Sequence, residues 1–132
     1  MALRVLVVDD SRIMRNTMKS VFAQMKIACE FVEADDGADA LLRLEMEPIE
    51  LVLLDWNMPK LSGLDFLKKV RSAEKYKKLP VIMVTSKTAR ANVIEAIQNG
   101  VTDYVTKPIN IDLFVEKLSR LPLFKGYDSG KR

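Results

Sequence analysis

The chain of 132 residues contains no histidine and a single cysteine. Without histidine it cannot itself build a Ser-His or Cys-His nucleophile pair, a histidine zinc site or a phosphohistidine carrier. Cys29 has no partner for an internal disulfide, so we expect it to fill core in a protein of a reducing compartment. Any chemistry therefore rests on carboxylates and lysines.

A signal peptide and a clustered basic motif are also missing. The opening MALRVLVVDD has a short apolar run that ends in two acids, so we expect a soluble cytoplasmic protein that does not enter a membrane. The net charge is +3, but the basic residues are scattered along helical segments without interleaved aromatics. We therefore expect no direct binding of nucleic acid.

Five short apolar segments alternate with helical patterns along the chain, which is long enough for one domain with a single sizeable core. The run LVLL is apolar throughout, as in a parallel strand that is buried on both faces. The rhythm predicts an α/β fold, a doubly wound, five-stranded parallel sheet of (βα)5 type. If its strand order is 2-1-3-4-5, the first and third strands are neighbours. The expected strands are 3–8, 29–33, 51–54, 80–85 and 103–106.

Apolar residues at helical spacing predict three core-facing helix stripes. Asn99-Gly100 is typical of a helix end. We expect a folded domain over 1–121 and a flexible tail over 122–132, where the pattern becomes polar and aperiodic. The stripe residues are Met14, Met18, Val21, Phe22, Met25, Val93, Ile94, Ile97, Phe114, Val115 and Leu118.

Polar residues follow four of the five expected strands, at the edge where a doubly wound sheet binds ligands. Three neighbouring carboxylates require protons or a cation, and Mg²⁺ is suited to oxygen ligands together with phosphate oxygens. Asp55 is then a candidate nucleophile toward phosphorus, with Lys107 opposite it and the Thr85 hydroxyl as a further donor. Taken alone, each has a simpler interpretation, such as helix capping by Asp9, Asp10 or Ser11. The strand-end residues are Asp9, Asp10, Asp55, Thr85, Ser86, Lys107 and Pro108.

Four stretches, VLVVDDS, DWNMP with the following SGL, LPVIMVTS and NGVTDYVTKP, resemble the receiver domain of two-component response regulators, in particular its stand-alone chemotaxis members. The resemblance covers residues 3 to about 121 and implies a flavodoxin-like (βα)5 fold. It implies phosphorylation of Asp55 from a phosphohistidine on a histidine kinase. Mg²⁺ would be held by Asp10, Asp55 and the backbone carbonyl of Asn57, with Asp9 mainly acting through water.

The resemblance further implies a switch. Lys107 would contact the phosphoryl group, and so could the hydroxyls of Thr85 and Ser86. On phosphorylation Thr85 would move toward the phosphoryl group and Tyr104 would rotate inward. This changes the surface of the fourth helix, fifth strand and fifth helix, which would bind a target such as a flagellar motor switch component. The resemblance also implies a cis Lys107-Pro108 bond, and a phosphatase is a further candidate partner.

Two positions depart from the family pattern. Ile109 stands where an aromatic is common, and Lys87 stands where chemotaxis members often have an acid. We hypothesise that Lys87 and Asn57 flank the path of attacking water and set the acyl-phosphate lifetime. Trp56, expected to be a partly exposed loop residue, is a candidate reporter of site occupancy.

Several alternatives stay open from the sequence. Within the family, the chain could be a phosphorelay intermediate or a receiver cut from a longer regulator. A haloacid-dehalogenase-type phosphatase is disfavoured, because its acids usually follow the first strand as Asp-x-Asp. A flavodoxin-like cofactor binder needs a Ser/Thr/Gly-rich loop where Asp9-Asp10 stand. A non-phosphorylated adaptor remains the last option. The leading interpretation is not a conventional enzyme but a protein that catalyses its own phosphorylation and dephosphorylation.

Overall fold

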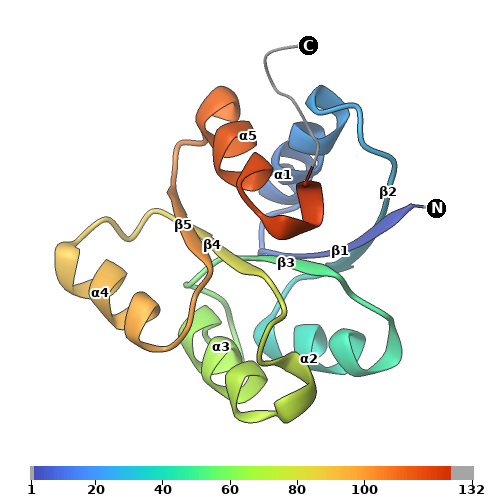
Figure 1. Cartoon of the computed structure of the whole chain (residues 1–132). Helices are drawn as coiled ribbons and strands as arrows, with labels where there is room; N and C mark the ends of the chain where they lie inside the picture. The colour runs from blue at the N-terminus through green and yellow to red at the C-terminus, as the bar shows by residue number, and fades with distance from the viewer. Residues whose placement is uncertain (1, 126–132) are drawn as a thin grey trace.

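The computed structural model describes residues 2–125, which fold into five parallel strands and five α-helices (Figure 1). The strands are β1 (Leu3–Val8), β2 (Cys29–Ala34), β3 (Leu51–Leu54), β4 (Val81–Thr85) and β5 (Asp103–Thr106). The helices are α1 (Arg12–Gln24), α2 (Gly37–Met46), α3 (Gly63–Ser72), α4 (Arg90–Gln98) and α5 (Ile111–Ser119), with 3-10 turns η1 (Glu74–Tyr76) and η2 (Pro122–Phe124). The strand order β2-β1-β3-β4-β5 confirms the predicted topology.

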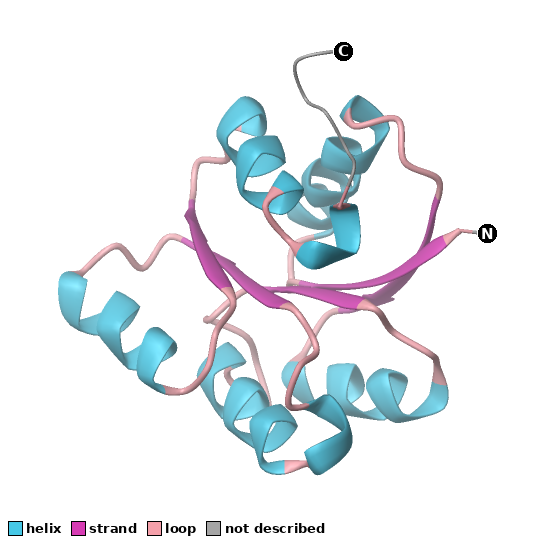
Figure 2. Ribbon diagram, viewed as in Figure 1, coloured by secondary structure: helices cyan, strands magenta, loops and turns pink. Residues whose placement is uncertain are grey.

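Helices cover both faces of the sheet, α1 and α5 on one and α2, α3 and α4 on the other (Figure 2). Every residue of β3 and β4 is buried, which confirms that LVLL is a strand covered on both faces. The two faces form separate apolar clusters. Phe66 is fully buried in the cluster between the sheet and helices α2 and α3. Phe114 is fully buried in the cluster between the sheet and helices α1 and α5. Cys29 is only half-buried and packs against the second cluster.

One predicted core stripe is only partly right: Val93 of α4 packs against the apolar cluster on that face of the sheet, but its two isoleucines do not. Ile94 and Ile97 of α4 are 42% and 61% exposed, whereas Ala96 is the fully buried residue of that helix. The helix lies at the β5 edge of the sheet, so only one narrow side of it has a strand to cover (Figure 1). The stripes of α1 and α5 are buried as predicted, apart from the partly exposed Met14.

The packed domain extends beyond the predicted boundary at residue 121. Pro122–Phe124 form η2, and the ring of Phe124 lies 6.5 Å from that of Phe22 between centroids. Phe124 is buried because its ring closes the cluster under α1 and α5. The rest of the predicted tail, 126–132, lies outside the described residues. Within residues 2–125, each helix is too short or too polar to cross a bilayer.

Candidate functional site

The backbone fixes three of the predicted site residues just beyond the strands. The N–H of Asp9 donates to the Ala34 carbonyl at 3.2 Å, and the N–H of Asp55 donates to the Val8 carbonyl at 3.0 Å. The N–H of Lys107 donates to the carbonyl of Thr85 at 2.9 Å. The parallel ladder thus continues past each strand end, and it brings these side chains to one edge of the sheet.

The ammonium of Lys107 lies between two buried carboxylates. Its Nζ is 2.8 Å from Asp9 Oδ2 and 3.1 Å from Asp55 Oδ2. Asp9 is 1% exposed and Asp55 is 6% exposed, so each depends on this cation for compensation. Burial acts to lower the pKa of Lys107, but the hydrogen bonds with Asp9 and Asp55, together with their negative charges, outweigh it and raise that pKa. Lys107 is therefore charged at any physiological pH.

Backbone donors fix the other oxygen of each carboxylate. The N–H of Ser11 donates to Asp9 Oδ1 at 2.8 Å, and the N–H of Trp56 donates to Asp55 Oδ1 at 2.6 Å. Ser11 also caps α1 through its hydroxyl, which accepts from the N–H of Met14. Capping of α1 is thus the role of Ser11, while Asp9 faces the site.

Arg15 supports the site from α1, and the sequence reading did not single it out. Its Nη1 donates to the carbonyl of Asp9 at 2.7 Å, and its Nε donates to Glu33 at 2.8 Å. The sequence signal was weak: an arginine one turn after the helix start is common. Only the packing of α1 beside β2 makes it a support for Asp9.

Asp10 completes an acidic cluster. It is exposed, unlike Asp9 and Asp55, and one carboxylate oxygen from each of the three lies within 4.8 Å of the others. Hard oxygen donors at this spacing, open to solvent on one side, fit a divalent cation that keeps part of its water shell. Asn57, the fourth predicted ligand, is exposed and lines the same opening as Asp10.

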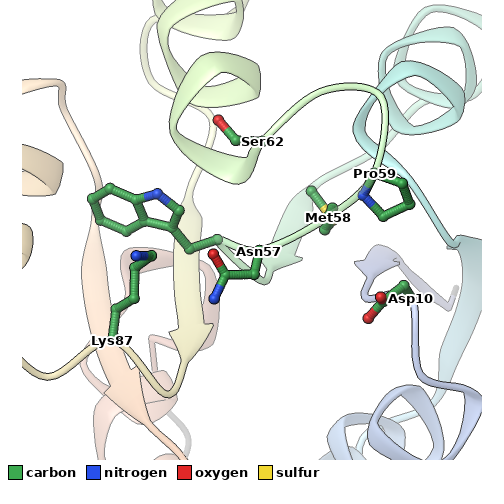
Figure 3. A pocket seen from close by; sticks show the side chains of 7 residues that line it. Asp10, Asn57, Met58, Pro59, Ser62 and Lys87 are labelled. Atoms are coloured by element: carbon green, nitrogen blue, oxygen red, sulfur yellow. The ribbon is translucent and has the colours of Figure 1, made fainter.

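A solvent-open pocket of about 450 Å³ lies beside this cluster. Asn57 stands between Asp10 on one side and Lys87 on the other, and Met58, Pro59 and Ser62 complete the wall (Figure 3). The Lys87 ammonium lies over the Trp56 ring, 5.6 Å from its centroid. Trp56 is only 8% exposed, so the expectation of a partly exposed loop residue is wrong. Lys87 covers the ring and places a positive charge at the pocket.

The remaining predicted residues occupy β4, β5 and the loops that follow them. Thr85 is fully buried and its hydroxyl accepts from the N–H of Lys87 at 3.3 Å, whereas Ser86 is exposed. The hydroxyl of Tyr104 donates to the carbonyl of Lys87 at 2.6 Å, and the ring is 8% exposed. Burial and then the charge of Asp55 raise the pKa of Tyr104. Tyr104 thus points inward in this structure.

The turn after β5 contains two features noted in the sequence, the predicted cis peptide bond and the departure from the family pattern at Ile109. The Lys107–Pro108 peptide bond is cis. Ile109, which stands where an aromatic is common, is half-buried and packs against the apolar cluster under α1 and α5.

Residues 5–119 match the family model described as the response regulator receiver domain. The chain belongs to this receiver domain family. This receiver is 39% identical over 119 residues to the chemotaxis protein CheY of Pseudomonas aeruginosa, a match that covers 90% of the chain and 95% of that protein. Receiver domains of CheY-like proteins take phosphate from histidine kinases and act on downstream targets.

Solved structures place the receiver in the same fold. The chemotaxis response regulator CheY4 of Vibrio cholerae superposes with a TM-score of 0.81 at 30% identity, covering 91% of this chain and 98% of that one. The Mn(2+)-bound form of response regulator Rcp1 also superposes with a TM-score of 0.81, at 25% identity, covering 96% and 97%. This chain therefore shares its fold with both of these response regulators.

Proposed function

We propose that this receiver is a signalling switch that accepts a phosphoryl group on Asp55 from a histidine kinase. Phosphorylation then changes its affinity for a target protein in chemotaxis. One observation carries the proposal: at the carboxyl edge of the sheet, Asp55 binds the Lys107 ammonium at 3.1 Å and lies within 4.8 Å, oxygen to oxygen, of two further carboxylates. The likeness to CheY of Pseudomonas aeruginosa supports the chemotaxis assignment.

The transfer step needs a donor histidine from the partner, since this chain has none. A carboxylate oxygen of Asp55 attacks phosphorus while the P–N bond of the phosphohistidine breaks. The bonding pair returns to the imidazole, and an acyl phosphate remains on Asp55. Lys107 and the hydroxyls of Thr85 and Ser86 would bind the phosphoryl oxygens, so catalysis consists of positioning and charge neutralisation.

Mg²⁺ would be held by Asp10, Asp55 and the backbone carbonyl of Asn57, with Asp9 acting mainly through water. When bound, it supplies positive charge to the transferring phosphoryl oxygens. The Mn(2+)-bound Rcp1 structure supports a divalent cation at a receiver site of this fold. Asp10 is the solvent-facing member of the cluster and would admit the ion, while Asp9 is held by Ser11 and Lys107.

The signal would leave through α4, β5 and α5. Ile94, Ile97 and Leu113 expose apolar surface there, 42%, 61% and 46% respectively, beside a groove lined by Tyr104 and Lys117. A rearrangement of Thr85 toward the phosphoryl group would act on this face through the Lys87 backbone, which contacts both Thr85 and Tyr104. A flagellar motor switch component is the proposed target, and a phosphatase is a further proposed partner.

Lys87 and Asn57 line the pocket beside the acyl phosphate and are proposed to set its lifetime. Exchange of Lys87 for glutamate would remove the cation over Trp56 and place a base near the path of the attacking water. The dephosphorylation rate of Lys87→Glu should therefore differ from that of the wild type. An unchanged rate would remove Lys87 from this role.

The proposal is tested by intact-mass analysis after incubation with Mg²⁺ and acetyl phosphate. We expect the gain of one phosphoryl group, which should be absent in Asp55→Asn and in a sample with chelator. A gain that persists in Asp55→Asn would place the modification elsewhere. If no adduct forms and beryllofluoride with Mg²⁺ leaves Trp56 fluorescence unchanged, the chain is an adaptor and the proposal fails.

A further inference from the structure

Contrary to the expectation of scattered basic residues, one segment of the chain at the end of α3 and in η1 is strongly basic. Six of the eleven residues from 68 to 78 are lysine or arginine, and Glu74 is the one acid among them. Five of these basic side chains are exposed, and of these only Lys77 forms an ion pair within the described chain, with Glu74 at 3.0 Å. The end of α3 and η1 therefore carries an uncompensated positive charge.

An apolar groove of about 700 Å³ lies beside this charge. We call it the basic groove; Lys77, Lys78 and Arg71 form its rim, and Pro80, Pro122 and Leu123 form its apolar wall. Leu123 is 36% exposed, and η2 holds it in place through the buried Phe124. Glu50, the one acid among the described lining residues, already accepts from the backbone N–H of Arg4 at 3.1 Å.

Arg71 is the most enclosed cation of the groove. It is half-buried and donates to the carbonyls of Gly100 at 2.9 Å and Tyr76 at 2.8 Å, and to the hydroxyl of Thr102 at 3.4 Å. Burial lowers its pKa. No carboxylate pairs with it among residues 2–125, and a guanidinium has five N–H donors. A carboxylate from outside would supply the missing counter-charge.

We propose that the basic groove binds an acidic, leucine-bearing segment of a partner protein. Carboxylates of the segment would meet Arg71, Lys77 and Lys78, while its apolar side chains would pack on Pro80, Pro122 and Leu123. Nucleic acid would leave the apolar wall uncovered. The chain's own residues 126–132 have two basic residues and one acid, so their charge does not complement the groove.

The basic groove lies at the opposite edge of the sheet from Asp55. Glu50, Pro80 and Thr102 directly precede β3, β4 and β5, whereas the carboxylates follow the strands. A segment bound there leaves both the acidic cluster and the exposed residues of α4 accessible. The receiver can therefore be held by one partner through this groove while it is phosphorylated.

The test uses a short fluorescein-labelled peptide of alternating glutamate and leucine and measures anisotropy with the full chain. Matched probes replace its leucines by serine or its glutamates by glutamine, and an oligothymidylate represents nucleic acid. We expect the Glu-Leu peptide to bind about tenfold more tightly than each of the other three, with an affinity that falls as salt rises.

Variants locate the site. Lys77→Glu combined with Lys78→Glu should weaken binding of the Glu-Leu peptide about tenfold. Arg90→Glu makes the same charge change at one exposed position near the carboxyl edge of the sheet, and it should leave peptide binding intact. Leu123→Ser should weaken the Glu-Leu peptide but not the Glu-Ser peptide. Equal binding of the serine peptide or the oligothymidylate, or full affinity in the double variant, would overturn the proposal.

Discussion

Gly63 packs directly against the backbone of Asp55, and a Cβ atom at Gly63 would overlap with the Asp55 carbonyl oxygen. The N–H of Gly63 also donates to the carbonyl of Trp56 at 2.8 Å. The start of α3 thus rests on the peptide unit that carries the proposed phosphoacceptor, and only a residue without a side chain permits this contact.

Gly63→Ala should therefore lower both stability and metal affinity. We expect a loss of about 1–3 kcal/mol in the free energy of unfolding, because backbone must move. Mg²⁺ binding, followed by Trp56 fluorescence, should weaken with it. Gly37→Ala is the control, since its Cβ would overlap with the carbonyl of Leu61 instead of Asp55. If both variants weaken Mg²⁺ equally, the effect is not specific to the Asp55 contact.

Asp10 should have opposite effects on stability with and without metal. It brings a third negative charge to the cluster but has no hydrogen bond or ion pair to its side chain among the described residues. In chelator, Asp10→Asn should unfold at a higher urea concentration than the wild type, because like-charge repulsion falls. In saturating Mg²⁺ the order should reverse, because the wild type binds the ion more tightly and gains more stability from it. The same order in both conditions would contradict a metal role for Asp10.

Arg15 should act as a positioning residue for Asp9. Its hydrogen bond fixes the Asp9 carbonyl, so Arg15→Ala should weaken Mg²⁺ about tenfold, as is typical when a support of a metal ligand is lost. Lys19→Ala is a matched control, because Lys19 pairs with the same Glu33 at 3.0 Å but does not touch Asp9. Arg15→Lys should restore part of the affinity. Equal losses in Arg15→Ala and Lys19→Ala would assign the effect to Glu33.

Glu33 should contribute stability that depends on pH. Hydrogen bonds from Arg15 and then Lys19 lower its pKa below the ordinary 4.5. Its contribution is therefore present above pH 4.5 and is lost as pH falls through the lowered value. The side chain is 36% exposed, so Glu33→Gln should cost less than about 1 kcal/mol at neutral pH. Urea titrations should show this difference vanish in acid, while Glu45→Gln, at an exposed position, should show none.

Lys26 is a position where the natural residue is not the most stable one. It follows α1 with φ of 58°, and the N–H groups of Lys26 and Ile27 donate to the carbonyls of Ala23 and Phe22. This Schellman arrangement favours glycine, so Lys26→Gly should raise the free energy of unfolding by about 0.5–1 kcal/mol. Lys26→Ala keeps the Cβ atom and should give no gain. Thermal or urea unfolding measures both.

Much of the site was predictable because it depends on strand ends. The apolar runs end directly before Asp9, Asp55 and Thr85, and parallel strands bring their carboxyl ends to one edge. The position of Lys107 opposite the acids follows from the same rule. Its two ion pairs with Asp9 and Asp55 were not predictable, because β5 lies two strands from β3 and three from β1.

The sequence by itself determined the five-stranded alternation, the strand order through the receiver motifs, and which polar residues meet. Only the tertiary structure decided which apolar faces are covered: Ile94 and Ile97 have the spacing of a core stripe, but α4 at the sheet edge leaves them exposed. It likewise placed Arg15 against Asp9 and Lys87 over Trp56. The physical reason is that periodicity is a property of one element, whereas burial and cross-element contacts depend on what packs beside it.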